Sequence, residues 1–189
     1  MFLLERLVGV GVYSLLLVLV CFSLVGKSSK KIKKRLFIYS IILSVLAYNY
    51  VPYETADLYR IYKAIESFGK YSFGEFWRIQ TSGSQLDMAN IIYWLVGQTG
   101  HPHLLPAINA FVCYSCVFYI IGKTAEKNKI SGKNVALALL FYMSTETYLS
   151  IIGGIRSMLG VSLLAFCFYR EHCEKKFNIF HIFYTLSLF

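Results

Sequence analysis

The sequence predicts an all-α polytopic membrane protein. Apolar residues make up 57% of the chain and charged residues 15%, whereas an ordinary soluble domain carries about 25% charged residues. The apolar residues gather in runs that approach the about 20 residues a helix needs to cross about 30 Å of hydrocarbon. Lys and Arg cluster between these runs. We therefore expect a single membrane domain over residues 1–189 with about six transmembrane helices.

The apolar runs locate these expected helices. Each helical residue advances about 1.5 Å, so runs of 15 to 20 residues approach the thickness of the hydrocarbon layer. The final run is still apolar at Phe189, from which we expect a truncated domain with further helices beyond that residue. The expected spans are residues 7–25, 36–51, 104–122, 135–151, 155–169 and 177–189.

The placement of basic residues predicts the orientation, because short loops rich in Lys and Arg stay in the cytoplasm. Segments 27–35, 123–133 and 170–176 together hold thirteen basic and three acidic residues, and the opposite segments hold six basic and seven acidic ones. The net charge of +9 is therefore a topology signal and does not predict nucleic-acid binding. We expect the N-terminus outside and the first helix retained, because its basic cluster follows the apolar run.

The stretch of residues 52–103 is too polar to span a membrane and too long for a simple turn. Apolar residues at helical spacing predict an amphipathic helix that begins near Thr55 and ends at Gly69. A second apolar stretch, residues 86–97, has the length of an interfacial helix and not of a span. We expect an outer loop with these short helices at the membrane surface.

Asp57 and Arg60 lie one turn apart on the polar face of the first short helix. One interpretation is a solvated ion pair, which contributes little to stability. The other is that the pair belongs to a functional site on the outer face. The sequence leaves both open.

Arg156 lies inside an expected span, 14 residues before Arg170, or about 21 Å at helical rise. A charge at that depth is costly unless it faces protein or water. Arg156 either pairs with Glu146 or binds an anion, since a guanidinium grips phosphate with two parallel hydrogen bonds. The preceding glycines allow a helix to begin there, which favours an anion.

Other residues that suggest chemistry have simpler interpretations. His101 and His103 flank a proline but lack a third metal ligand at a recognisable spacing, so we expect a turn there and no metal site. Cys113 and Cys116 lie inside an expected span, where small side chains favour helix packing. No cofactor is expected.

Two segments resemble motifs of a known family. Residues 52–62, read Pro-Tyr-Glu-Thr-Ala-Asp-Leu-Tyr-Arg-Ile-Tyr, and residues 154–160, read Gly-Ile-Arg-Ser-Met-Leu-Gly, resemble the EpsG branch of the Wzy-like polysaccharide polymerases. The chain corresponds to about the N-terminal half of a family member. Ser157 stands where the family often has Gln, and the family's Phe-His-x-Ser-Ala-like motif is missing, since His181 lies too early.

The resemblance implies glycosyl transfer on the outer face of the bacterial cell membrane, in capsule, O-antigen or exopolysaccharide synthesis. The glycan would move from polyprenyl diphosphate to the sugar end of a new lipid-linked repeat. The implied partners are that lipid-linked glycan, membrane lipid and other capsule or exopolysaccharide assembly proteins. Neither a nucleotide sugar nor a metal is implied.

Such a reaction needs cations for the departing diphosphate and a group that takes the acceptor proton. Arg156 and Arg60 suit the first role, and Asp57 is the candidate for the second. Two alternatives stay open: Asp57 only orients Arg60, or the histidine of the missing motif is the base. The expected substrate-binding residues are Tyr62, Trp77 and Arg78.

Two other functions fit the same observations. A transporter or flippase for a lipid-linked sugar would also use outer aromatic residues and an intramembrane Arg, although the sequence lacks the internal repeats typical of transporters. A non-catalytic membrane scaffold would need no polar site. The sugar, its linkage and the oligomeric state do not follow from the sequence.

Overall fold

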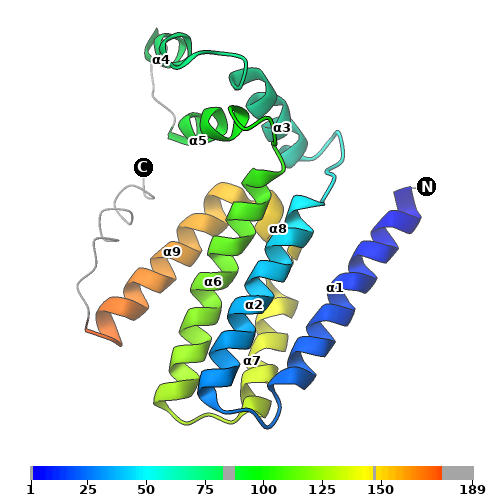
Figure 1. Cartoon of the computed structure of the whole chain (residues 1–189), viewed down its shortest axis with the longest axis vertical. Helices are drawn as coiled ribbons and strands as arrows, with labels where there is room; N and C mark the ends of the chain where they lie inside the picture. Colours follow the sequence, from blue (N-terminus) through cyan, green and yellow to red (C-terminus); the bar gives the residue numbers. More distant parts are fainter. Residues whose placement is uncertain (1, 83–87, 147, 176–189) are drawn as a thin grey trace.

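The computed structural model describes residues 2–82, 88–146 and 148–175 (Figure 1). All regular elements in these ranges are α-helices, so the predicted helical class is correct. The helices are α1 (Phe2–Leu24), α2 (Ser29–Tyr48), α3 (Asp57–Phe68), α4 (Phe73–Ser82), α5 (Met88–Gly97), α6 (Leu104–Lys127), α7 (Gly132–Thr145), α8 (Tyr148–Gly153) and α9 (Ile155–His172).

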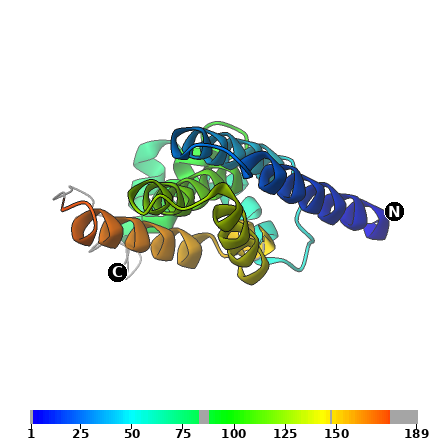
Figure 2. The same ribbon diagram turned by 90° about the horizontal axis from the view of Figure 1, so that it is seen from below.

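The helices form a bundle with a smaller group of helices at one end. In the bundle, α6 packs against α2, α7, α8 and α9, and α1 packs against α2 and α7. Seen along the bundle, α6 lies between the layer of α1 and α2 and the layer of α7 and α9 (Figure 2). We call α3, α4 and α5 the cap, which lies beyond one end of the bundle (Figure 1).

Helical spacing in α2 explains the bundle core. Ile32, Leu36, Tyr39 and Leu43 recur every three or four residues and are all at most 1% exposed, so they form one face that packs on α6. The Tyr39 ring stacks on Phe118 of α6 with centroids 5.8 Å apart. This packing makes α2 and α6 the central pair of the bundle.

The bundle end opposite the cap is rich in positive charge, and we call it the basic end. It holds the α1–α2 and α6–α7 connections and the last turn of α9 (Figure 1). The sequence segments 27–35, 123–133 and 170–175 therefore lie together at this end. The beginning of α1 lies on the side of the cap (Figure 1). Most basic residues therefore lie at the end of the bundle opposite the cap.

The prediction of about six transmembrane helices is wrong. Among the residues that the structure describes, one helix, α6, is long and apolar enough to cross a membrane. The apolar part of α1 that qualifies as a helix is Gly11–Leu24, which rises about 21 Å against about 30 Å of hydrocarbon. The central helix of a water-soluble bundle meets the same criteria as α6, so this observation by itself is weak evidence for a membrane.

Interruptions of the apolar helices explain the difference. α2 begins at Ser29, inside the basic cluster, and so includes five Lys or Arg residues. α7 ends after 14 residues at Thr145, and the expected span 135–151 is divided between α7 and α8. α9 contains three charged residues. The last expected span, residues 177–189, lies outside the described part of the chain.

The outer stretch of residues 52–103 holds three short helices where the sequence predicted two. The first is close to its predicted bounds, although its N-cap is Ala56 and not Thr55. The second predicted helix corresponds to α5, which begins at Met88. The helix between them, α4, was not predicted.

Candidate functional site

Two glycines allow the cap helices α3 and α5 to cross closely. A Cβ atom on Gly97 would lie 2.6 Å from the backbone oxygen of Ile65, and one on Gly69 would lie 2.6 Å from the backbone oxygen of Gly97. No larger side chain fits at these distances without moving the backbone. The crossing therefore fixes the spacing of α3 and α5.

A group of apolar side chains, which we call the junction cluster, joins the cap to the bundle. α3 contributes a face with Leu58, Tyr62 and Ile65, all at most 6% exposed. Leu105 comes from the first turn of α6, and Ile155 is the first residue of α9. The full set of buried members is Leu58, Tyr62, Ile65, Tyr93, Val96, Leu105 and Ile155.

Tyr62 and His103 add a polar contact at the edge of this cluster. The Tyr62 hydroxyl lies 3.3 Å from Nδ1 of His103, and the two rings meet edge to face with centroids 4.9 Å apart. Burial raises the pKa of the Tyr62 phenol, so the hydroxyl keeps its proton at neutral pH. The structure places Tyr62, an expected substrate-binding residue, in the packing between α3 and α6.

Asp57 and Arg60 form the ion pair that their spacing predicts. Nη1 of Arg60 lies 3.5 Å from Oδ1 of Asp57, and the two side chains are 76% and 83% exposed, respectively. They lie on the face of α3 opposite Leu58 and Tyr62. An exposed pair of this kind contributes little to stability, so both charges are available to another molecule.

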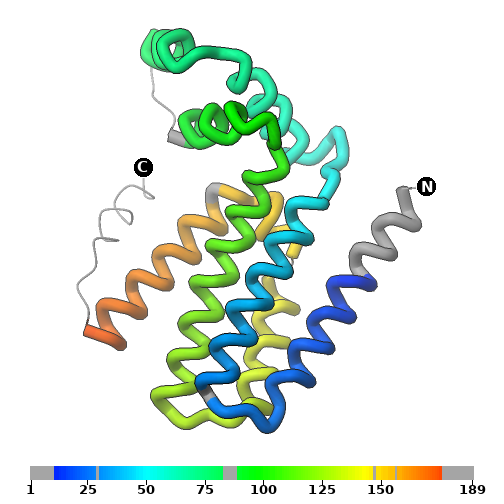
Figure 3. Tube along the Cα trace, viewed as in Figure 1, coloured from blue at the N-terminus to red at the C-terminus, as the bar shows by residue number. Residues whose placement is uncertain are grey.

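Arg156 is the second residue of α9, which begins shortly after α8 ends at Gly153. α9 then runs beside α6 (Figure 3). Gly154 is the N-cap of α9 and accepts a backbone hydrogen bond of 2.9 Å from Met158. The structure describes the backbone of Arg156 but not its side chain, so pairing with Glu146 stays a prediction. Its neighbour Ile155 belongs to the junction cluster, which brings this turn close to α3.

A buried amide holds α8, the helix before α9. Asn109 of α6 is 2% exposed, and its Nδ2 donates a hydrogen bond of 2.6 Å to the backbone carbonyl of Ile151 in α8. An unpaired carbonyl in such a place would be costly. Asn109 therefore fixes α8, and with it the beginning of α9, against the central helix.

A capping box starts α4. The Ser72 backbone N–H donates to Oε2 of Glu75 at 2.9 Å, the Ser72 hydroxyl donates to the same oxygen at 2.8 Å, and the Glu75 N–H donates to the Ser72 hydroxyl at 3.4 Å. These reciprocal bonds satisfy donors that a helix start leaves unpaired. They also lower the pKa of the Glu75 carboxyl.

α4 and α5 carry a group of aromatic side chains that we call the aromatic platform: Phe73, Phe76, Trp77 and Trp94. The Phe73 ring lies 5.8 Å from Trp77 and 5.3 Å from Trp94 between centroids, and Phe76 stacks on Trp94 at 5.6 Å. Phe73 and Trp77 are 57% and 42% exposed. Arg78 follows Trp77 and is also exposed, so two expected substrate-binding residues lie on this surface.

A pocket of about 380 Å³ opens beside the glycine crossing. Glu66 and Lys70 of the α3 end are among its lining residues. It adjoins the aromatic platform, because the indole N–H of Trp94 donates to the Tyr71 carbonyl at 3.0 Å, one residue after Lys70. The pocket and the platform together form a surface with charged, polar and aromatic groups.

Within residues 2–82, 88–146 and 148–175, no group of three or more His, Cys, Asp or Glu side chains is placed to hold a metal ion. His103, at the turn before α6, is occupied with Tyr62 and also lies near Tyr48, with ring centroids 5.9 Å apart.

The expected site residues divide between two surfaces. Asp57 and Arg60 lie on α3 near the turn before Arg156, whereas Trp77 and Arg78 lie on α4. Sequence reasoning missed Phe73 as the ring partner of both Trp77 and Trp94, because it missed α4. The Ser-x-x-Glu spacing of the capping box was the signal that predicts this helix.

Comparisons of the chain with protein-family models, with curated proteins and with solved structures find no match.

Proposed function

We propose that this chain is a membrane polysaccharide polymerase that transfers lipid-linked glycan repeats on the outer face of the bacterial cell membrane. The observation that carries the proposal is that Ile155 belongs to the same buried cluster as Leu58 and Tyr62, the junction cluster. The break between α8 and α9 therefore lies close to α3, which also contacts α8. The two segments that resemble the polymerase family thus come from distant parts of the chain to one place.

Exposed apolar side chains support a membrane location. Phe22 of α1, Phe141 of α7 and Val161 of α9 are 75%, 71% and 62% exposed. Water-soluble monomers rarely expose large apolar patches, and lipid would cover these side chains. In the orientation that basic residues favour, the basic end faces the cytoplasm and the cap faces outward.

The proposed reaction uses the charges at the beginning of α3 and α9. An acceptor hydroxyl attacks the anomeric carbon of the growing glycan, and the bond from that carbon to the diphosphate oxygen breaks. Polyprenyl diphosphate leaves with the bonding electrons, and Arg60 and Arg156 stabilise its charge. The acceptor proton passes to the Asp57 carboxylate, which lies 3.5 Å from Arg60 and otherwise orients that side chain.

The aromatic platform and the neighbouring pocket fit the acceptor glycan. Aromatic rings such as Trp77 present a flat apolar face, and Arg78 and Lys70 supply donors for sugar hydroxyls. The 380 Å³ volume of the pocket lies within the range of small-molecule sites. The platform would bind sugars of the acceptor repeat other than the one that carries the reacting hydroxyl.

Exposed residues on α3 allow a test with matched controls. In a strain that lacks the chromosomal copy, full-length protein with Asp57→Asn or Arg60→Gln should yield no long polysaccharide. Glu54→Gln and Lys63→Gln are the controls, because Glu54 is an exposed carboxylate three residues earlier and Lys63 forms the next exposed ion pair, 3.4 Å from Glu66. Polymer length is measured on gels, and protein level by immunoblotting of membranes.

The outcomes separate the candidate functions. Loss of polymer in both Asp57 and Arg60 variants, with single repeat units accumulating outside the cell membrane, supports the polymerase. Single units trapped inside would instead indicate a flippase. Normal polymer lengths in both variants would overturn the proposed function, as would equal losses in the controls.

A further inference from the structure

A second surface, at the basic end, combines an apolar groove with cations. The groove has a volume of about 490 Å³ and runs between α2, α6 and α9. Its lining is apolar or aromatic except for a few polar groups near one end. Lining residues that carry the argument are Lys33, Phe37, Ser115, Tyr119, Leu163 and Phe166.

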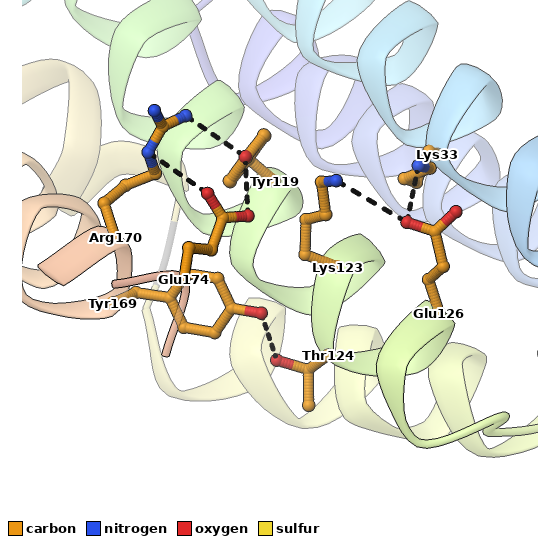
Figure 4. Close-up of polar contacts among 8 residues, drawn as sticks. All are labelled: Lys33, Tyr119, Lys123, Thr124, Glu126, Tyr169, Arg170 and Glu174. Atoms are coloured by element: carbon orange, nitrogen blue, oxygen red, sulfur yellow. Dashed lines mark hydrogen bonds and ion pairs between the residues drawn. The ribbon is translucent and has the colours of Figure 1, made fainter. Parts of the chain in front are cut away.

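The charged groups gather at the end of the groove where Lys33 lies. Figure 4 shows Lys33 and Lys123 directed at one carboxylate, Glu126, with Nζ to Oε2 distances of 2.8 and 3.6 Å. Two ammonium groups thus share one negative charge. This group of three side chains therefore carries a net positive charge.

Tyr119 joins this charged group to a second one on α9. Its hydroxyl donates to Oε1 of Glu174 at 2.8 Å and accepts from Nη1 of Arg170 at 3.2 Å (Figure 4). Lys123 and Arg170 both lie 5.9 Å from the centre of the Tyr119 ring. The groove is therefore largely apolar along its length, and at its basic end a hydrogen-bonded group holds three cations and two carboxylates.

We propose that this groove binds an anionic membrane phospholipid, with an acyl chain along α6 and the phosphate at Lys33 and Lys123. A ligand for this surface must be apolar at one end and negative at the other, because the groove has that polarity. Basic pockets between helices on the cytoplasmic side bind anionic headgroups in this way. The proposal rests on the proposed membrane location but not on glycosyl transfer.

The experiment measures lipid binding to purified full-length protein in detergent by native mass spectrometry. Phosphatidylglycerol is compared with phosphatidylcholine of identical acyl chains. Lys33→Gln should weaken phosphatidylglycerol binding about fivefold, the effect of one basic residue at an anionic lipid, and leave phosphatidylcholine binding unchanged. Lys133→Gln is the control, because Lys133 is an exposed residue of α7 outside the groove.

Glu126→Gln should change the affinity for phosphatidylglycerol in the opposite direction to Lys33→Gln. Removing this carboxylate leaves both ammonium groups for the phosphate, so phosphatidylglycerol should bind several-fold more tightly. If the Lys33–Glu126 pair only held α2 against α6, both variants would weaken binding and lower the Tm. That result would overturn the proposal.

A groove-filling variant tests the acyl chain. Val112→Phe adds volume to a lining residue and should reduce binding of phosphatidylglycerol. Equal affinity for both lipids in all variants would contradict the proposal, and displacement by inorganic phosphate would indicate an anion site without a lipid. Because these readouts do not depend on polymer synthesis, their failure is distinct from failure of the proposed function.

Discussion

The side-chain amide of Asn109 donates a 2.6 Å hydrogen bond to the backbone carbonyl of Ile151. This bond crosses from the central helix α6 to α8, directly before the break at Gly153 and Gly154. Asn109 has almost no solvent access, so water does not replace the amide when it is removed. The position of Arg156, two residues after the break, depends on this contact.

Asn109→Leu should therefore lower the free energy of unfolding by about 2 kcal/mol, since it leaves a buried carbonyl without its donor. The measurement is denaturant or thermal unfolding of the purified protein. Asn134→Leu is the control, because Asn134 is exposed on α7. Equal stabilities of the two variants would contradict the role of Asn109.

Gly97→Ala should destabilise the cap, by about 1 to 3 kcal/mol. The added Cβ would meet the backbone oxygen of Ile65 at 2.6 Å, and backbone atoms do not move aside cheaply. Gly74→Ala is the matched control, because a Cβ there meets nothing within 4 Å and Ala favours a helix over Gly by up to about 1 kcal/mol. Unfolding followed by tryptophan fluorescence, which reports Trp77 and Trp94 of the cap, should place the stability of Gly97→Ala below the wild type and that of Gly74→Ala at or above it.

The capping box predicts acid sensitivity of α4. The pKa of Glu75 is lowered by its bonds to Ser72, so the ionised carboxyl stabilises the folded helix. This contribution is fully present above the ordinary Glu value of about 4.3 and is lost as the pH falls through the lowered folded pKa. Protection of the α4 amides against hydrogen exchange, corrected for the pH dependence of intrinsic exchange, should fall over that range.

Glu75→Gln should remove this pH response, because the side chain that closes the capping box at the start of α4 then no longer titrates. Glu66→Gln, a neutralisation on α3, should retain it. An unchanged acid response in Glu75→Gln would show that the capping box is not its source.

Tyr62 and Trp77 should respond differently to substitution, although both were expected to bind substrate. Tyr62→Phe removes only the hydroxyl near His103 and keeps the buried ring, so it should cost about 1 kcal/mol of stability and leave polymer length unchanged. Trp77→Ala removes an exposed ring and should shorten the polymer without lowering the Tm. Shorter polymer in Tyr62→Phe at normal protein levels would assign Tyr62 a direct role with substrate.

Helical periodicity predicted some elements correctly. The spacing of Leu58, Ile65 and their neighbours predicted the buried face of α3, and the structure confirms that Asp57 and Arg60 lie opposite it. Periodicity suffices to predict the buried and exposed faces of α3, because α3 is one continuous helix.

The number of spans could not be predicted from apolar length alone. α7 ends at Thr145 and α8 begins at Tyr148, inside the expected span of residues 135–151. Hydropathy adds up side chains and does not detect an interruption of the backbone. Similarly, the sequence predicted a loop over the basic cluster 27–35, whereas five of its six basic residues belong to the first turns of α2.

Contacts between residues far apart in the chain could not be predicted from the sequence. Tyr62 lies beside His103 because α3 lies next to the turn before α6. Asn109 lies beside Ile151 because α8 packs on α6. No local pattern marks these pairs. The aromatic platform was missed for the same reason, since Trp94 joins Phe73 only when α5 lies against α4.

The cap is an insertion whose two attachment points are neighbours. The chain leaves α2 after Tyr48 and returns to α6 at His103, and the rings of these two residues are 5.9 Å apart. Below them α2 and α6 hold each other directly, through Tyr39 with Phe118 and through the Ser44 hydroxyl, which donates to the Ala107 carbonyl at 2.8 Å. Because both connections to the cap lie at one point of the bundle, the contact between α2 and α6 does not depend on the path of the chain through residues 49–102.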